Sequence, residues 1–444
     1  MTPEYSLIFD LGRTNKKCFV FDKAWEVVDQ AYAQLPWGED EAGEACEDVQ
    51  ALSDWVKAQA THWQEKYLIR QMNVSAYGAS LVHVGKEGKP VLPLYDYLKA
   101  FPPELEQQFF DAYGAKPTWC RQTASPWLGM LNSGVQLYWL KHHRPTAFAQ
   151  IHTSLHLPQY VASLLHGQRT CEYTSLGCHT GLWDMEQQAY HSWVEEEGLM
   201  KFFPPLRPTS HQIKLTLQDR DLIAGIGIHD SSAALVPYLM SQTEPFLLLS
   251  TGTWSIALNP FNQSPLTDAE LTQDCLQFLQ VDGKAVKASR LFLGQEYADQ
   301  VARLNVHFLQ QAGYDRSISF SKEWQALERK AFQWKYLPQS PRPEKEQWRH
   351  CETYEAAYHQ LVWELVLRQQ EALELVESPG AQRVIVDGGF VDNEVFLKLL
   401  HRAMPDKEIW TSRQPLGSAF GALLLLEEKP EPERITEKLK LRKV

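Results

Sequence analysis

The sequence has no long hydrophobic run. Its longest apolar stretch, residues 419–426, is less than half the length that a helix needs to cross a bilayer. The first residues show no basic start followed by an apolar run and a small-residue cleavage site, which is the pattern of a secretory signal. These absences predict a cytoplasmic protein that is not inserted in a membrane.

Positive charge is also in short supply. The 444 residues contain 43 Lys and Arg against 55 Asp and Glu, for a formal net charge of −12. Nucleic acids and anionic membrane surfaces require clustered positive charge, so neither is expected as a main partner. An anionic small molecule remains compatible with this balance because it needs only a local site.

The cysteines give little support for disulfides or for zinc. Their number, seven, is odd, they are scattered, and no Cys-x-x-Cys occurs. Cys171, Cys178 and His179 lie close in the sequence, but a zinc site would need a fourth ligand and a tighter spacing. Reduced thiols in a cytoplasmic protein are the better interpretation.

Length and composition predict a large soluble globular chain. At roughly 150 residues per domain, the length favours two or three domains. Hydrophobic residues make up 44% and charged residues 22% of the chain, which is close to the average for globular proteins. A chain of this size can bury a core without disulfide or metal staples.

Two segments repeat one local pattern, in which an apolar strand, a polar turn with glycine and a second apolar strand follow one another. The first has its turn at residues 10–15, and the second has its turn at residues 250–253. Both are β-hairpin signals. The internal echo predicts two domains of similar design, with a boundary near residues 242–245.

A third polar turn, Asp387-Gly388-Gly389, ends another apolar strand after a helical stretch expected over residues 354–375. Glycines and small hydroxyl side chains let backbone N–H groups approach phosphate oxygens closely. Each turn alone could be an ordinary hairpin with a polar tip, but the three together predict a phosphate-bearing ligand between two lobes. Neither a P-loop nor a Gly-x-Gly-x-x-Gly fingerprint is present.

The first turn also carries charged side chains. Asp10 could hold Mg²⁺ through water molecules, because Mg²⁺ keeps much of its hydration shell in proteins. Thr14, Asn15 and Lys17 could face the phosphates of a bound nucleotide.

These motifs resemble those of the FGGY family of carbohydrate kinases. Residues 9–17 (FDLGRTNKK) are similar to the family's first phosphate motif, and residues 250–254 (STGTW) resemble the second in its rhamnulokinase form. Residues 386–393 (VDGGFVDN) resemble the adenosine motif, and residues 416–421 (LGSAFG) the late glycine element. The resemblance extends from residue 5 to about residue 426 and favours the rhamnulokinase and fuculokinase branch.

The resemblance implies an α/β fold of two RNase H-like domains of the actin/hexokinase type with a cleft between them. The N-terminal lobe, residues 1–243, would bind the sugar and supply the catalytic base, and the C-terminal lobe, residues 244–444, would bind ATP. Mg²⁺ is implied with Asp10 as its site. The nucleotide-binding positions expected are Gly12, Thr14, Asn15, Lys17, Gly252, Thr253, Gly388, Gly389 and Asn393.

Residues 228–234 (IHDSSAA) resemble the family segment that holds the general base, which implies this role for Asp230. A carboxylate just before a helix could accept the proton of a sugar hydroxyl. Capping of that helix is a compatible alternative for Asp230, and His229 is expected to be a hydrogen-bonding neighbour.

The sugar is expected in the N-terminal lobe. Tyr77 and Gly78 match an aromatic-Gly element of rhamnulose and fuculose kinases, whereas Ser80 stands where those have an aspartate. Asn132 and Gln136, at one-turn helical spacing, could bind sugar hydroxyls or pack between helices. Arg13, Lys16 and Lys17 make the first turn more basic than in many relatives, which could tighten phosphate binding or change the nucleotide used.

The resemblance implies phosphorylation of a ketose, with the C1 hydroxyl of a 6-deoxy-ketohexose such as L-rhamnulose or L-fuculose as the first expectation. The alternatives are a pentulose such as ribulose or xylulose, and a sugar or nucleotide sensor without transferase activity. An ATPase that moves a protein partner is a weaker third interpretation. The expected partners are the ketose and ATP, and the chain is expected to be a monomer or a homodimer.

Overall fold

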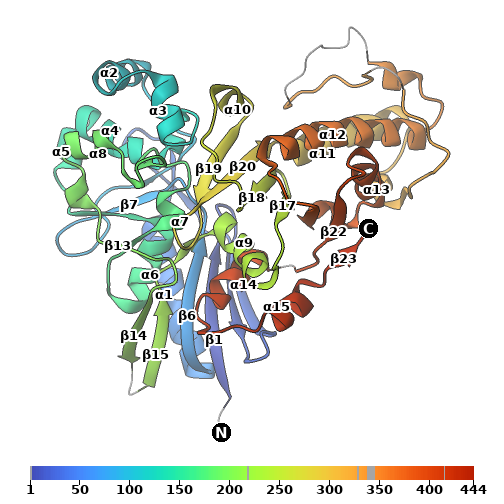
Figure 1. The fold of residues 1–444 in the computed structure, drawn as a ribbon. Coiled ribbons are helices and arrows are strands. Elements are labelled where there is room, and N and C mark those ends of the chain that lie inside the picture. Colours follow the sequence, from blue (N-terminus) through green and yellow to red (C-terminus); the bar gives the residue numbers. More distant parts are fainter. Residues whose placement is uncertain (1–2, 218–219, 328–329, 338–345, 415) are drawn as a thin grey trace.

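Two seven-stranded sheets form the framework of the protein, and Figure 1 shows them side by side with helices around them. The computed structural model describes residues 3–217, 220–327, 330–337, 346–414 and 416–444. This arrangement is the two-domain, actin/hexokinase-like α/β fold that the resemblance implied. Among the described residues, no helix combines the length and the apolar character that crossing a membrane requires.

The first sheet has the order β14-β15-β6-β1-β2-β3, and β16 pairs with β6 beside this path. The expected hairpin is confirmed, because β1 and β2 are antiparallel and joined by the turn at residues 12–15. The strands are β1 (Glu4–Leu11), β2 (Lys16–Phe21), β3 (Val27–Ala33), β6 (Leu68–Ala76), β14 (Gln212–Leu217), β15 (Arg220–Gly225) and β16 (Ile228–His229).

Both faces of this sheet are covered. Leu7, Phe9 and Leu11 alternate with Ile8 along β1, and the two sets belong to different core clusters. The helices α1 (Val49–Lys66) and α6 (Leu157–His166) pack on one face, and α9 (Asp230–Ser241) and α14 (Gly417–Leu424) on the other. A strand buried on both faces reads as a continuous apolar run, as residues 6–9 do.

The second sheet has the order β19-β20-β18-β17-β21-β22-β23 and contains the second expected hairpin, β17–β18. The expected helix over residues 354–375 is confirmed as α12 (Tyr354–Val376), which packs with α11 (Leu293–His307) and α13 (Glu394–Ala403) on one face. The strands are β17 (Phe246–Thr251), β18 (Ser255–Asn259), β19 (Cys275–Leu279), β20 (Ala285–Leu291), β21 (Arg383–Gly388), β22 (Glu408–Thr411) and β23 (Arg442–Lys443).

One core cluster joins the two sheets. It contains Ile8 and Phe21 from the first sheet, Leu248 and Ile385 from the second, and Phe420 of α14. Figure 1 shows α9 and α14 together in the middle of the molecule, with α15 (Pro432–Leu439) beside them. Because α14 comes from the end of the chain and packs on the first sheet, the boundary between residues 243 and 244 stays a prediction.

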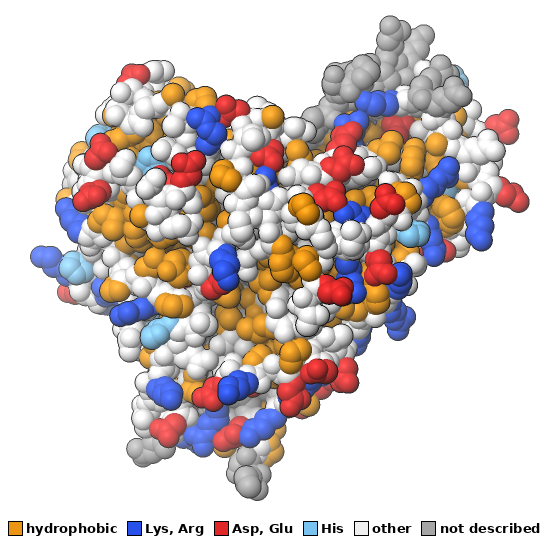
Figure 2. Space-filling model, viewed as in Figure 1, with side chains coloured by type: hydrophobic (Ala, Val, Ile, Leu, Met, Phe, Trp, Pro, Cys, Tyr) orange, Lys and Arg blue, Asp and Glu red, His pale blue; other side chains and the backbone are white. Residues whose placement is uncertain are grey.

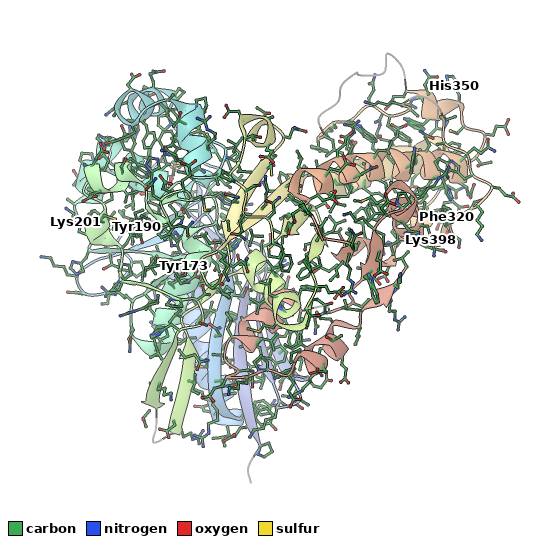
Figure 3. The ribbon with its side chains drawn as sticks, viewed as in Figure 1. Tyr173, Tyr190, Lys201, Phe320, His350 and Lys398 are labelled. Carbon is green, nitrogen blue, oxygen red and sulfur yellow. The ribbon has the colours of Figure 1, made fainter. Side chains whose placement is uncertain are left out.

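The remaining elements surround an aromatic core in the N-terminal half that includes Phe109, Trp119 and Trp193. Tyr173, labelled in Figure 3, lies against Gly283 in the turn of the β19–β20 hairpin, so this hairpin contacts the N-terminal half. The helices around the aromatic core are α2 (Pro103–Tyr113), α3 (Lys116–Gln122), α4 (Ser133–His143), α5 (Pro145–Phe148), α7 (Tyr173–Leu176) and α8 (Ser192–Glu196). In the C-terminal half, α10 (Asp268–Thr272) precedes β19. The short strands are β4 (Trp37–Glu39), β5 (Ala45–Glu47), β7 (Leu81–Val84), β8 (Leu94–Tyr95), β9 (Thr153–His156), β10 (Cys171–Glu172), β11 (Trp183–Asp184), β12 (Ala189–Tyr190) and β13 (Leu206–Arg207).

Candidate active site

Three parallel strands of the first sheet end at the same level. Asp10 on β1 pairs with Ser75 on β6, and Ser75 pairs with Ile228 on β16. The residues that follow these positions therefore emerge together where the three strands end. Because this sheet belongs to the N-terminal half of the chain, we call this edge of the sheet the N-terminal edge. It brings Asp10, Tyr77, Gly78 and Asp230 together, and their roles stay predictions.

Asp10 occupies the face of the sheet that α14 covers. Its Oδ1 accepts a 2.8 Å hydrogen bond from the Ser418 hydroxyl of that helix, and Lys17 is its cross-strand partner. Burial raises the pKa of Asp10, and the nearby charge of Asp230 raises it further, whereas the Ser418 hydrogen bond and Lys17 lower it. The Asp230 carboxyl group is thus near enough for its charge to act on Asp10.

Asp230 is the first helical residue of α9, and His229 holds the cap position before it. Its side chain is 34% exposed, and its Oδ1 accepts hydrogen bonds from the Ser231 amide at 2.6 Å and from the Ser231 hydroxyl at 3.2 Å. The carboxylate is therefore held in place while remaining reachable, which suits a group that must accept a proton from a bound molecule.

His229 lies behind Asp230. Its Nε2 is 3.3 Å from Asp230 Oδ1 and 3.1 Å from Cys178 Sγ, and burial lowers its pKa. A Cβ added to Gly78 would come within 3.0 Å of both the Cys178 sulfur and the His229 ring. A larger residue at position 78 would therefore have to displace the Cys178 or His229 side chain by a few tenths of an ångström. A sugar contact there stays a prediction.

The first turn is tight and its cations are partly neutralised. The Gly12 amide donates to the Asn15 carbonyl at 2.9 Å, and Thr14 is exposed at the tip. Arg13 forms an ion pair with Asp96 at 2.5 Å, and Lys16 forms one with Glu47. Two of the three cations expected near phosphate are therefore paired with carboxylates, and Lys17 is the one beside Asp10.

Tyr77 belongs to a small cavity next to this turn, which Arg13, Trp37, Glu47 and Tyr97 also line. The Arg13 guanidinium lies 4.8 Å from the Trp37 ring centroid and 5.1 Å from that of Tyr97. The cavity has a volume of about 10 Å³, which is room for about one water molecule, so a sugar would contact this cluster from outside. Ser80 is buried at the same cavity.

Asn132 and Gln136 are both fully buried. The Asn132 amide donates to the His179 carbonyl at 2.9 Å, and Gln136 donates to the Met130 carbonyl at 2.7 Å. These bonds match the packing alternative for the two residues, and a contact with sugar hydroxyls stays a prediction.

The second sheet has a corresponding edge where β17 and β21 end, which we call the C-terminal edge. It is formed by close backbone contacts rather than by charged side chains. β17 and β21 are parallel, and Thr251 pairs with Gly388. A Cβ on Gly388 would lie 1.9 Å from the Thr251 carbonyl oxygen, and its φ is +82°, so only glycine fits there. Gly252 and Thr253 are exposed in the β17–β18 turn.

A cavity of about 490 Å³ opens beside this edge. Gly389 and Asn393 line it together with Tyr297, Tyr358 and residues 315–319. The Asn393 amide donates to the Tyr358 hydroxyl at 2.9 Å, and its oxygen caps α13. Asp387, which precedes Gly388 in β21, is buried, and burial raises its pKa to about 6. The cavity is large enough for a nucleoside and carries two of the predicted nucleotide positions.

The residues fit Mg²⁺ and ATP in chemical terms. A carboxylate oxygen is the ligand that Mg²⁺ prefers, and Asp10 offers one at the edge of the sheet. Among the described residues, no group of three or more His, Cys, Asp or Glu side chains is arranged to hold a metal, so a site at Asp10 would use few protein ligands and several waters. The glycines at 388 and 389 and the cavity beside them suit a nucleotide.

The two edges approach each other near Trp254. Arg290 on β20 lies with its guanidinium 5.6 Å from the Trp254 ring centroid, and Asp274 holds it with hydrogen bonds of 2.8 and 3.1 Å. The charge of Arg290 also lowers the pKa of Cys178, the neighbour of His229, against the stronger effect of burial. The second sheet reaches the edge that carries Asp230 through β19, because the ring centroids of Phe278 and His229 are 6.0 Å apart.

A larger cavity of about 1120 Å³ lies elsewhere, where β1 and β6 begin. Its lining mixes cations such as Arg70, Lys214 and Arg434 with carboxylates such as Glu4 and Asp221. It contains none of the predicted site residues, which emerge where β1 and β6 end. Figure 2 likewise shows acidic and basic side chains interspersed over the visible face.

Sequence reasoning missed three contributors to the site, namely Glu47, Trp37 and Ser418. Glu47 lies 30 positions before Tyr77, and Ser418 lies 408 positions after Asp10. The late glycine element did point to residues 416–421, but not to the contact of its serine with Asp10.

Comparisons with known proteins agree with this geometry. Residues 5–233 match the FGGY family of carbohydrate kinases, N-terminal domain, and residues 243–434 match the carbohydrate kinase FGGY C-terminal domain. The sequence has no significant match among curated proteins.

Several solved structures have the same fold. A carbohydrate kinase from Novosphingobium aromaticivorans superposes with a TM-score of 0.77 at 23% identity, covering 100% of this chain and 94% of that one. A xylulose kinase from Lactobacillus acidophilus gives 0.75 at 14% identity, covering 99% and 93%. Plasmodium falciparum glycerol kinase with ADP gives 0.71 at 13% identity, covering 99% and 92%.

The N-terminal domain match alone spans more than half of the chain, and the C-terminal match covers most of the remainder. A reachable carboxylate at one edge and a cavity beside Gly389 at the other are compatible with phosphoryl transfer, in which the protein mainly positions the reactants and stabilises charge. The chain belongs to the FGGY family of carbohydrate kinases and is a sugar kinase.

Proposed function

We propose that this kinase transfers the γ-phosphoryl group of ATP to the C1 hydroxyl of a ketose, with Asp230 as the general base. The observation that carries the proposal is the common register of β1, β6 and β16, which brings the exposed Asp230 carboxylate next to Tyr77 and Asp10. A sugar hydroxyl bound between Tyr77 and Asp230 would lie within reach of the Asp10 and Asp230 carboxylates.

In this scheme Asp230 takes the proton of the attacking hydroxyl, and its hydrogen bonds from Ser231 keep one oxygen fixed while the group reacts. Asp10 would hold Mg²⁺ through water, and Lys17 and the backbone of the turns at 12–15 and 252–253 would bind the phosphates. Bound Mg²⁺ with ATP supplies the phosphoryl donor and neutralises its charge. Gly388, Gly389 and Asn393 hold the nucleoside. Closure of the two lobes would exclude water, which would otherwise accept the phosphoryl group.

The preferred acceptor is a 6-deoxy-ketohexose such as L-rhamnulose or L-fuculose. Support comes from the His229-Asp230 and Gly252-Thr253-Trp254 segments, which are similar to rhamnulokinases, and from the Tyr77 ring, which offers an apolar face to a methyl group. A pentulose is the second candidate, because solved structures of this fold include several xylulose kinases. Ser80, which replaces an aspartate, also favours keeping this alternative.

The test is an ADP-release assay with ATP and Mg²⁺ over L-rhamnulose, L-fuculose, L- and D-ribulose, D-xylulose and glycerol, with a reaction lacking sugar as control. We expect the largest kcat/KM with a deoxy-ketohexose and little release without sugar. Release with a pentulose alone would replace the proposed acceptor. If no member of the panel gives release while ATP still binds, the proposed ketose acceptor is wrong.

A further inference from the structure

A buried ion pair lies directly behind the first phosphate turn. Lys16 is 1% exposed and Glu47 is 6% exposed. The Lys16 ammonium contacts Glu47 Oε1, the Gly12 carbonyl oxygen at 2.8 Å and the Arg13 carbonyl oxygen at 3.1 Å. Of the three N–H donors of the ammonium group, two have acceptors in the turn, and Glu47 neutralises the charge as an ion-pair partner.

These contacts fix how the turn faces its surroundings. In a trans peptide the C=O and the following N–H point in opposite directions. With the carbonyls of Gly12 and Arg13 directed at Lys16, the N–H groups of Arg13 and Thr14 point away from it. Thr14 is exposed, so this is the outer side of the turn. Two neighbouring backbone N–H groups on that side can donate hydrogen bonds to phosphate oxygens.

Glu47, the acidic member of the pair, contacts Tyr77 on the side of the site that is assigned to the sugar. Glu47 Oε2 accepts a hydrogen bond from the Tyr77 hydroxyl, and the Tyr77 ring centroid lies 5.4 Å from Lys16 Nζ. Burial, together with the Glu47 charge, raises the pKa of Tyr77 well above its ordinary value, so the hydroxyl stays protonated and keeps donating. One buried pair therefore contacts both the phosphate turn and the wall of the small cavity.

We propose that Lys16 and Glu47 are positioning residues for phosphoryl transfer, which set the N–H groups of the first turn and the Tyr77 wall in one fixed arrangement. This inference rests on the proposed function, because it assigns the two sides to phosphate and sugar. A buried ion pair adds little net stability compared with well-packed apolar side chains, but it can specify a single geometry. All the partners named here for the pair belong to the candidate site.

The test compares Lys16→Met, Glu47→Gln and the double variant, which removes both charges and so leaves no lone buried ion. We expect each single variant to lower kcat by about 10²-fold with the ketose that the wild type uses best, because a misplacement of about 1 Å costs that much. The double variant should lose much less than the product of the two single losses, since both changes break one shared interaction.

Lys287→Met is the matched control. Lys287 is also a buried lysine, 2.6 Å from Glu270 and with its side chain 3% exposed, but it lies on β20 away from the residues assigned to the site. It should lower the unfolding midpoint as the other variants do while kcat of the folded enzyme stays within about twofold. If the Lys16 and Glu47 variants behave like this control, the pair is only structural and the proposal is wrong. Losses that multiply in the double variant would also overturn it.

Two further measurements separate this proposal from the proposed function. Amide hydrogen exchange over residues 11–17 should speed up in Glu47→Gln and Lys16→Met but not in Lys287→Met, whatever the substrate is. ATP binding by calorimetry should weaken in the same two variants. If the wild type phosphorylates no ketose yet these two differences appear, the acceptor assignment fails and the positioning role stands. Unchanged exchange and unchanged ATP binding would remove the positioning role even in an active kinase.

Discussion

The two sheets present the same strand–turn–strand element, but they equip it differently. At the N-terminal edge the turn between β1 and β2 is surrounded by charged side chains, with Asp10 and Lys17 paired across the strands and Asp230 nearby. At the C-terminal edge the turn between β17 and β18 and the end of β21 are defined by backbone contact, with Gly388 against Thr251 and Gly294 against Gly252.

This difference teaches where each edge is sensitive. At the N-terminal edge, removing a carboxylate or an ammonium group should impair the function of the edge even if its shape is kept. An edge that works through close backbone approach fails when a single methyl group is added, even if no charge changes. The first kind suits proton and phosphoryl chemistry, and the second suits holding a nucleotide.

The largest effect at the C-terminal edge is expected for Gly388→Ala. The new Cβ would lie 1.9 Å from the Thr251 carbonyl oxygen, and the backbone at φ +82° and ψ −147° is nearly restricted to glycine. We expect a loss of more than ~3 kcal/mol in unfolding free energy and no detectable ATP binding. Gly389→Ala is the comparison, because its Cβ would meet the same oxygen at an ordinary 3.8 Å. Equal stability losses in the two variants, measured by denaturant unfolding, would contradict the account.

A smaller effect, and one that depends on pH, is expected for Asp387→Asn. Burial raises the pKa of Asp387 from 3.8 to about 6, so between these values the folded protein binds the proton more tightly than the unfolded chain. Wild-type stability therefore falls as pH rises from about 4 to about 7, by about 3 kcal/mol from this group. The variant has no titrating carboxyl group at position 387. The difference in unfolding free energy, variant minus wild type, should therefore increase by about 3 kcal/mol between about pH 4 and about pH 7. A difference that does not change with pH would contradict the assignment.

The smallest effect is expected for Ser418→Ala. The Ser418 hydroxyl lowers the pKa of Asp10, so its removal should raise that pKa. Because Mg²⁺ needs the carboxylate form of Asp10, the acidic limb of the kcat profile should move to higher pH while kcat near pH 8 changes by about twofold or less. Ser418→Thr keeps the hydroxyl and should restore the wild-type profile. An acidic limb that stays in place in Ser418→Ala would separate Ser418 from the function of Asp10.

The sequence predicted most of the framework because the signals are local. Both hairpins could be predicted from an apolar run, a glycine turn and a second run. Asp230 could be assigned through the resemblance of residues 228–234 to the family segment, and the structure places it at the start of α9. The register that brings Asp10, Tyr77 and Asp230 to one edge then follows from parallel pairing.

The contacts that organise the site could not be predicted in the same way. Lys16 shares a strand face with Cys18 and Val20, and Lys17 shares the other with Phe19 and Phe21. Because both faces are covered, the alternation did not indicate which lysine would be buried. Glu47 and Ser418 come from distant positions, and only the packing of β5 and α14 onto the first sheet brings them to the turn and to Asp10.

The division of tasks between the two edges is tested most directly in one variant, Asp230→Asn, by measuring ketose turnover and ATP binding on the same preparation. The account predicts that kcat falls by about 10²–10⁴-fold, because the proton acceptor is lost, while calorimetry gives a Kd for ATP within about threefold of the wild type. Retained turnover would remove Asp230 from the role of base. A parallel loss of ATP binding would show that the two edges do not have separate tasks.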